Sequence, residues 1–191
     1  MTDEKLLVQQ AQSDPAAFGL LYDKYFQQIY AFIYLQTRDE ALTKDVVAAA
    51  FESALHNIHK FEWRGFSFGA WLYRIARNEL GQQRRRQKWL APWQQSGLGT
   101  ALHTDGRALE LRLQEKERLS QVQAALWQLS AKDRELITLR FWQELETEEV
   151  AQILGCSTQQ VYVRLHRALK RLRQKMDALQ IAERIGTNVA F

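Results

Sequence analysis

The 191-residue sequence predicts an all-α protein made of two small helical domains that are joined by a flexible linker. Apolar residues recur at helical spacing in both halves, whereas the alternation typical of β-strands is scarce. Between the halves lies a stretch without periodicity, residues 91–108, that holds one of the two prolines and three of the nine glycines. We therefore expect a first domain at 1–90, the linker at 91–108, a second domain at 109–180 and a C-terminal tail at 181–191.

Composition narrows the class of protein. Apolar residues make up 46% of the chain, which is enough for real hydrophobic cores. No apolar run approaches the roughly 20 residues that span a bilayer, and the N-terminus lacks the apolar core of a signal peptide, so no membrane insertion is expected. A single cysteine allows no internal disulfide, which favours the reducing cytoplasm.

The first domain is expected to open a helix at Ser13-Asp14-Pro15, because Ser or Asp caps a helix and Pro suits its first turn. The aromatic residues that follow at helical spacing favour packing. A break at Thr37-Arg38-Asp39 leads to a second helix. Its regular apolar face consists of Val46, Val47, Ala50, Phe51, Ala54, Leu55 and Ile58.

The opposite face of that second helix carries Asp45, Ala48, Ala49, Glu52 and His56. Glu52, His56 and His59 have a spacing that metal ligands can have, but no matching cluster occurs elsewhere, so neither a metal nor a cofactor is expected. Residues 1–62 hold nine Asp or Glu against five Lys or Arg. This acidic balance indicates a surface for a protein partner.

An aromatic loop and a basic helix follow. Residues 61–68 crowd three Phe and one Trp around Arg64 and Gly65, where an unpaired base could stack; a loop folded onto the core is an equal alternative. From about Gly69 a helix is expected to face Trp71, Leu72, Ile75 and Ala76 inward. Its outer face carries Arg74, Arg77, Asn78, Arg84 and Arg85, which is typical of a nucleic-acid surface.

The second domain begins with two expected helices, at about 109–128 and 131–143. Ser130 and Asp133 have the spacing of a capping box for the second of them. Farther on, Cys156 lies in a turn, where a structural thiol is favoured over a reactive one.

The stretch from Thr147 to Met176 predicts two helices with a tight break. Thr147 is the expected cap of the first helix, and Gly155 is its expected stop because glycine tolerates left-handed backbone. Ser157 and Gln160 form a capping box for the second helix. The apolar stripe of that helix consists of Val161, Leu165, Ala168, Leu169, Leu172 and Met176.

The other face of this second helix is polar and basic. Six Lys or Arg and no acid fall between Ser157 and Met176. Caps, turn and charge together favour a helix-turn-helix that enters a DNA major groove over an ordinary αα-hairpin with a solvated face. The candidate DNA contacts are Gln159, Gln160, Val163, Arg164, Arg167 and Lys170.

Specific segments resemble one family over nearly the whole chain. LYDKY, DVVAAAFESAL and FSFGAWLYRIARNE look like region 2 of the extracytoplasmic-function (ECF) sigma factors of bacterial RNA polymerase. LSAKDRELITLRFWQELETEEVAQILGCSTQQVYVRLHRALKRLR looks like their region 4. AWLYRIARN and VxxRLHRA at this separation, with a loose linker between them, make a specific combination.

The resemblance implies roles for the residues already singled out. Core RNA polymerase would dock on the face with Asp45, Ala48, Ala49, Glu52 and His56. Region 4 would read the upstream −35 element as duplex through the second helix of the helix-turn-helix. Region 2 would read and help open the −10 element through Arg64, Phe66, Trp71, Arg74, Arg77, Asn78, Arg84 and Arg85. Many members of the family are restrained by an anti-sigma factor, so the resemblance implies an anti-sigma factor as a further possible partner.

Two departures from the family pattern stand out. Ala48 and Ala49 replace a polar pair on the polymerase-facing side, and Tyr162 and Val163 replace small or basic residues in the recognition helix. The first departure supports one alternative, a sigma-like adaptor with weak or no polymerase binding. A stand-alone helix-turn-helix regulator is a second alternative, against which the absence of an obvious dimer helix speaks. An enzyme is not expected, since no nucleophile–base pair, P-loop or ligand set is present.

Overall fold

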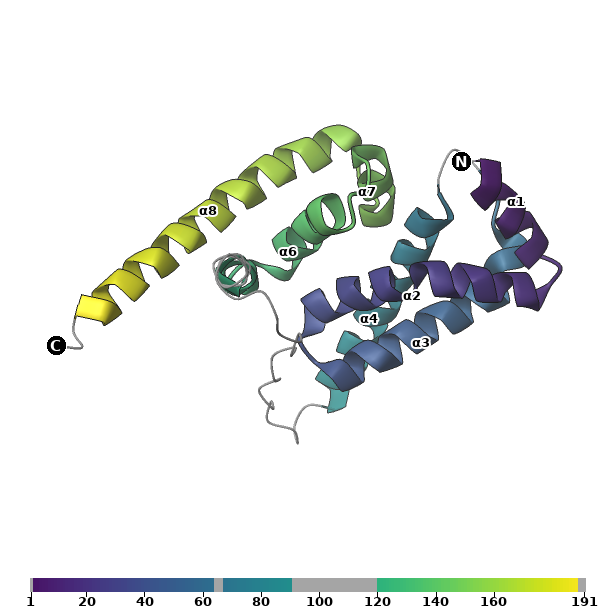
Figure 1. Ribbon diagram of the computed structural model, residues 1–191, viewed down its shortest axis with the longest axis horizontal. Coiled ribbons are helices and arrows are strands. Elements are labelled where there is room, and N and C mark those ends of the chain that lie inside the picture. The colour runs from purple at the N-terminus through teal and green to yellow at the C-terminus, as the bar shows by residue number, and fades with distance from the viewer. Residues whose placement is uncertain (1, 64–66, 91–119, 189–191) are drawn as a thin grey trace, which may run out of the picture. The chain divides into compact units, whose positions relative to one another are not determined.

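The computed structural model describes residues 2–63, 67–90 and 120–188, and every regular element within these ranges is a helix (Figure 1). The expected linker at 91–108 and the side chains of Arg64 and Phe66 lie outside the described residues. The chain divides into two compact units, one of Met1–Gly99 with Thr138–Thr158 and one of Thr100–Ile137 with Gln159–Phe191.

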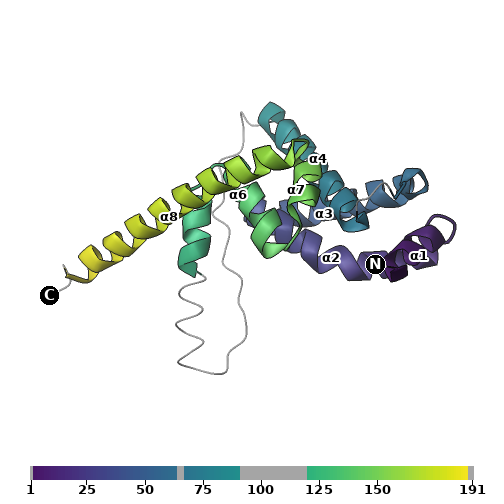
Figure 2. The same ribbon diagram turned by 90° about the horizontal axis from the view of Figure 1, so that it is seen from above.

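The first unit is built on α1 (Thr2–Ala11), α2 (Pro15–Thr37), α3 (Glu40–Asn57) and α4 (Phe68–Leu90). The chain packs α3 against both α2 and α4, with a single 3-10 turn, η1 (Ile58–Lys60), between α3 and the loop before α4 (Figures 1 and 2). The centre of this unit is completely buried and consists of Leu21, Ile29, Phe32, Ile33, Val46, Ala50, Phe68, Leu72 and Ala76.

The helix starts in this unit follow the local capping signals. Asp14 caps α2 by accepting the Ala16 N–H at 2.9 Å, and Asp39 caps α3 by accepting the Leu42 N–H at 3.0 Å. Between the two helices Arg38 adopts φ 51°, the left-handed conformation that ends α2. The predicted break at residues 37–39 is confirmed.

Two details of this unit differ from the sequence prediction. The helix α1 was not expected, because its apolar residues are few. Leu55 was placed on the apolar face of α3, but it is 45% exposed. The reason is geometric: Leu55 lies at the border of the apolar face, seven residues after the exposed Ala48 and so close to the same side of the helix.

The same unit includes the segment from Thr138 to Thr158. It begins with a π-helical turn, η2 (Thr138–Trp142), in which the Gln143 N–H donates to the Thr138 carbonyl at 3.1 Å, five residues back. The expected helix at 131–143 is therefore α-helical only as far as Ile137. After the turn, α7 (Thr147–Leu154) ends at Gly155, whose φ of 66° confirms the predicted stop.

The cap of α7 is Glu146, which corrects the prediction of Thr147. Thr147 is the first residue of the helix and is buried. The Glu146 N–H donates to the Glu149 carboxylate at 3.1 Å, so an acid three residues later supplies the cap.

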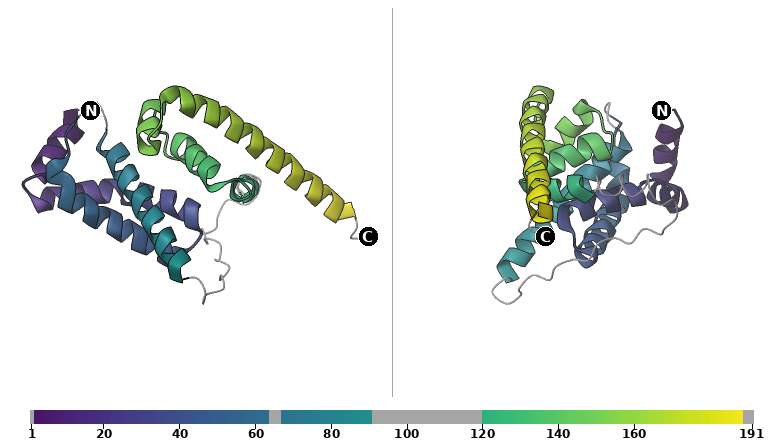
Figure 3. Two further views of the ribbon diagram at one scale, coloured as in Figure 1. Left: turned by 180° about the vertical axis from the view of Figure 1, so that it is seen from behind. Right: turned by 60° about the vertical axis from the view of Figure 1, so that its left-hand side comes forward.

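The second unit contains a helical stretch at residues 120–127, α6 (Ala131–Ile137) and the long α8 (Thr158–Asn188), which Figure 3 shows as one continuous helix. Ser130 accepts the Asp133 N–H at 3.2 Å, as its predicted cap position requires. The buried apolar residues of the described part of this unit are Ala125, Leu126, Leu129, Leu136, Ile137, Val161 and Ala168. Within this unit, Arg171 forms a bidentate ion pair with Asp133. Its Nη2 donates to Oδ1 at 2.8 Å and its Nε donates to Oδ2 at 3.0 Å.

Candidate nucleic-acid interface

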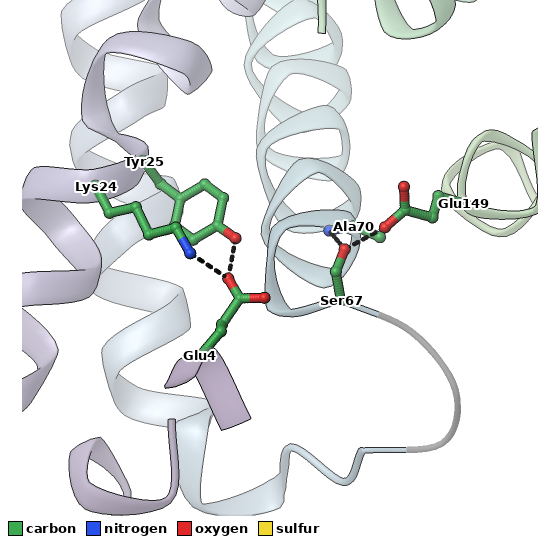
Figure 4. A network of polar contacts seen from close by, with 6 residues as sticks. All are labelled: Glu4, Lys24, Tyr25, Ser67, Ala70 and Glu149. Carbon is green, nitrogen blue, oxygen red and sulfur yellow. Dashed lines mark hydrogen bonds and ion pairs between the residues drawn. The ribbon is translucent and has the colours of Figure 1, made fainter. Parts of the chain in front are cut away.

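The first turn of α4 is held by Ser67 and Gly69. The Ser67 hydroxyl accepts the Ala70 N–H at 3.1 Å and so caps the helix. At Gly69 an added Cβ would lie 2.8 Å from Cε1 of Tyr25, so only a glycine lets α2 and α4 approach this closely. The Tyr25 hydroxyl donates to the Glu4 carboxylate, which also pairs with Lys24 at 2.9 Å (Figure 4).

Burial and this contact with Glu4 fix the protonation of Tyr25. Burial, the hydrogen bond to Glu4 and its negative charge all raise the pKa of Tyr25 well above its ordinary value. Burial and the charge of Glu149 raise the pKa of Tyr73 in the same direction. Both phenols are therefore neutral hydrogen-bond donors at physiological pH.

The outer face of α4 is arranged as the basic pattern predicts. Arg74, Asn78 and Arg85 are exposed, and Arg77 is half-buried. Trp71 and Ile75, which were expected to face inward, are only half-buried, whereas the buried Tyr73 takes an inward place that the pattern did not predict. The half-exposed indole of Trp71 lies one turn from the charged side chain of Arg74, so both are accessible from the same side of the helix.

Arg84 has a structural contact. It donates to the Gln36 carbonyl at 2.6 Å, in the last turn of α2, where carbonyls lack helical partners and a cation is favoured. Arg84 and Gln36 lie 48 residues apart in sequence, so no local sequence pattern predicts this contact.

The aromatic loop is partly folded onto the core. Phe61 and Phe68 are buried, and their ring centroids lie 5.8 Å apart. Trp71 packs on both, at 5.2 and 5.4 Å, and Trp63 meets Phe61 edge-on at 5.9 Å. Phe61 and Phe68 therefore fold onto the core and are not available for stacking with a base. Trp63 and Trp71 keep partly exposed rings.

Beside these rings lies a cavity of about 430 Å³. It combines aromatic surface with two cations, Lys60 and Arg74, and one carboxylate, Glu62, a lining on which a flat heteroaromatic ring can stack. The lining residues are Lys60, Phe61, Glu62, Ala70, Trp71, Arg74, Gln152 and Ile153.

The second candidate surface lies on α8. The helix begins directly after Ser157, and Val161 and Ala168 are buried on its inner side. Leu169, which was assigned to the apolar stripe, is 37% exposed because it lies at the border of that side. All of the candidate DNA contacts are exposed, namely Gln159, Gln160, Val163, Arg164, Arg167 and Lys170.

Apolar side chains are part of this α8 surface. Tyr162 is 59% and Val163 is 45% exposed, although both are large and apolar. Exposed side chains of this kind on an otherwise basic helix are available to contact the methyl groups and edges of bases.

The third candidate surface is the outer side of α3. Asp45, Ala48, Glu52 and His56 are exposed and Ala49 is half-buried. Next to Ala48 the surface is more apolar than the sequence suggested. Leu55 is exposed, and Tyr22, 39% exposed, packs its ring on Phe51 with centroids 4.6 Å apart.

The described residues offer neither a metal site nor a membrane-spanning helix. No group of three or more His, Cys, Asp or Glu in these ranges is placed to hold a metal ion. None of the described helices has the length and apolar character needed to cross a membrane.

Comparisons with known proteins agree on one family. A model of Sigma-70 region 2 matches residues 21–90, and a model of Sigma-70 region 4 matches residues 119–172. The ECF RNA polymerase sigma factor SigX of Bacillus subtilis is 33% identical over 172 residues, which cover 85% of both chains. The ECF sigma factor BldN of Streptomyces coelicolor is 31% identical over 171 residues, and the match spans 87% of this chain and 63% of BldN.

A solved structure is similar in the same way. The sigma factor RpoE of Bartonella quintana, crystallised in complex with the anti-sigma factor NepR, matches with a TM-score of 0.68 and 25% identity, covering 84% of this chain and 96% of that one.

Proposed function

The chain belongs to the ECF RNA polymerase sigma factors, and we propose that it recognises promoters through two DNA surfaces, α4 for the melted strand and α8 for duplex. As a member of this family it directs core RNA polymerase to specific promoters and aids promoter melting. Its partners are core RNA polymerase, promoter DNA and an anti-sigma factor. It carries out no catalysis of its own and works in the cytoplasm, where bacterial RNA polymerase acts.

The α8 surface carries the −35 assignment. Its six candidate side chains are all exposed on one helix that follows a glycine stop and a tight turn. Arginine and glutamine can make paired hydrogen bonds to base edges in the major groove, whereas Lys170 is suited to a phosphate. This exposed, acid-free face is the single observation that supports duplex readout most strongly.

The α4 surface carries the −10 assignment. Trp71 offers a partly exposed ring next to the cations Lys60 and Arg74 around the cavity. The partly exposed Trp63 packs on Phe61, another lining residue. Stacking on an aromatic ring is available to a base only when the duplex is open, so this surface favours single strands. Arg77, Asn78 and Arg85 extend the same polar face along the helix.

The α3 surface is the proposed docking site for core polymerase. Ala48 is exposed and cannot form the hydrogen bonds of the polar residue that the family usually has there. Neighbouring Leu55 and Tyr22 add exposed apolar area, while Asp45 and Glu52 keep charged groups at the edge. We infer that this surface binds the polymerase through a larger share of apolar contact.

Competition for core polymerase tests this docking surface. Reversing charge at Asp45 or Glu52 is expected to weaken competition against a housekeeping sigma factor, and changing Ala48→Gln with Ala49→Asp is expected to strengthen it. Each charge-assisted hydrogen bond at an interface is worth about 1.5–3 kcal/mol before the cost of desolvation. No response to either set would remove α3 from the interface and favour the adaptor alternative.

A further inference from the structure

The turn that leads from α3 into the aromatic loop is only three residues long. It is η1, and it is closed by the Phe61 N–H, which donates to the Ile58 carbonyl at 2.9 Å. A single 3-10 turn has few hydrogen bonds of its own, so contacts with neighbouring segments set its position. Its last residue and the next two, Phe61 and Glu62, line the cavity together with Trp71.

The Gln12 side chain binds both ends of this turn. Its Nε2 donates to the Ile58 carbonyl at 3.2 Å and to the Phe61 carbonyl at 2.8 Å. A primary amide nitrogen carries two N–H groups, so one side chain can serve both acceptors. A carboxylate at this position would donate to neither carbonyl and would set negative charge against both.

Gln12 lies on a firmly packed part of the chain. It directly follows α1, and its N–H donates to the Val8 carbonyl at 3.1 Å. Val8 and Ala11 are buried, and Glu4 of α1 binds the hydroxyl of Tyr25 in α2 (Figure 4). The two bonds from Gln12 therefore tie the turn to the packed pair of α1 and α2.

Phe61 passes this restraint on to the indole rings assigned to the −10 strand. It is 8% exposed, and its ring centroid lies 5.2 Å from that of Trp71 and 5.9 Å from that of Trp63. Gln12 binds the carbonyl of this same residue. Losing that bond lets the Phe61 ring shift, and the two indoles that pack on it shift as well.

We propose that Gln12 is a positioning residue for the −10 strand, because it sets the place of Phe61 and thereby of the rings on which an unpaired base stacks. The inference rests on the proposed role of α4 in binding the melted strand. The model of Sigma-70 region 2 matches residues 21–90, so Gln12 and α1 precede the part of the chain that this family model covers. The inference gives α1 a part in promoter opening.

Fluorine NMR tests the positioning without DNA. The full chain is labelled with 5-fluorotryptophan, and the signals of its six tryptophans are assigned by Trp→Phe replacement. Gln12→Glu keeps the size of the side chain but removes both donors. It is expected to shift the signals of Trp63 and Trp71 and to leave that of Trp127, in the other unit, in place. Gln9→Glu adds the same charge at an exposed position of α1 and is expected to shift none of the three.

Promoter opening tests the consequence in the complete holoenzyme. The full chain and purified core polymerase are bound to a promoter that they transcribe, and permanganate detects unpaired thymines. Gln12→Glu is expected to lower the ratio of open to closed complex about three- to tenfold, the size of one or two lost hydrogen bonds. Gln12→Met removes the donors without adding charge and is expected to act in the same direction. Competition for core polymerase and binding of the upstream duplex are expected to change less than about twofold, as for other surface substitutions.

The outcomes separate this inference from the proposed function. Unmoved signals of Trp63 and Trp71 in Gln12→Glu, or an equal loss of opening in Gln9→Glu, would overturn the positioning role. Shifted signals without a loss of opening would overturn it too, as would an equal loss of polymerase binding, which indicates general destabilisation. If Trp71→Ala opens the promoter as well as the parent does, the −10 role of α4 fails, and the inference fails with it.

Discussion

Replacing Gly69 by alanine tests how closely α4 must approach α2. The new Cβ would lie 2.8 Å from Cε1, 3.1 Å from the hydroxyl oxygen and 3.2 Å from Cζ of Tyr25. The ring has little room to retreat, because it is buried, packs near Phe68 with centroids 5.7 Å apart, and is held by Glu4. Overpacking of this kind costs about 1–3 kcal/mol.

Gly81→Ala is the matched control on the same helix. Its Cβ would meet only a terminal nitrogen of the Arg85 side chain, at 3.6 Å. Without a clash, alanine in a helix interior is favoured over glycine by about 0.5–1 kcal/mol. The two Gly→Ala changes are therefore expected to move stability in opposite directions, and to differ by about 2 kcal/mol or more.

Hydrogen exchange of amides in α2 and α4 is the assay, because it reports the stability of this unit separately from the rest of the chain. Gly69→Ala is expected to speed exchange there, and Gly81→Ala to slow it. In a Tyr25→Leu background the ring that clashes with the new Cβ is absent. Adding Gly69→Ala there is expected to speed exchange much less than it does in the parent. If Gly69→Ala protects these amides as well as Gly81→Ala does, the close approach of α2 and α4 is not as described.

Further predictions follow from contacts on the other surfaces. Arg84→Ala is expected to destabilise the first unit by about 1–2 kcal/mol through the lost bond to Gln36, as measured by urea unfolding; equal stability of Arg84→Ala and Arg85→Ala would contradict it. Because the pKa of Tyr25 and of Tyr73 is raised by folding, their contribution to stability is intact below about pH 10 and is lost as pH rises above it. Unfolding of the parent above pH 10 should be steeper than that of Tyr73→Phe. On α8, Ala in place of a base-reading Arg164 or Arg167 should cost about 1–3 kcal/mol at one base position, whereas loss of a phosphate contact should weaken all duplexes alike and flatten the salt dependence; unchanged duplex binding by both variants would remove α8 from the −35 role.

The local parts of the fold were predictable because their signals lie within a few residues. Asp14, Asp39 and Ser130 cap helices as their side chains require, and Gly155 takes the left-handed conformation that ends α7. The exposure of the candidate DNA contacts on α8 was predictable for the same reason, since a helix presents residues at fixed angles. Glu146 was missed because Thr147 is the more usual type of cap residue, and Glu148 and Glu149 fall in the first turn of the helix from either start.

Contacts between distant segments were not predictable. Leu55 looks like a core residue by spacing alone, and only the position of neighbouring helices shows that it is exposed. Tyr73 and Gln143 meet across 70 residues, and Ser67 and Glu149 across 82. Such pairs depend on tertiary packing, for which one sequence holds no periodic signal.

In vitro transcription with purified core polymerase on a promoter library tests the central claim most directly. The full chain is expected to produce transcripts from a defined set of start sites that share an upstream and a −10 element. Ala in place of both Arg164 and Arg167 should alter or abolish the upstream preference, while Trp71→Ala should reduce opening at the −10 element. Transcripts no more abundant than those of core polymerase alone, from a chain that remains folded, would contradict the account.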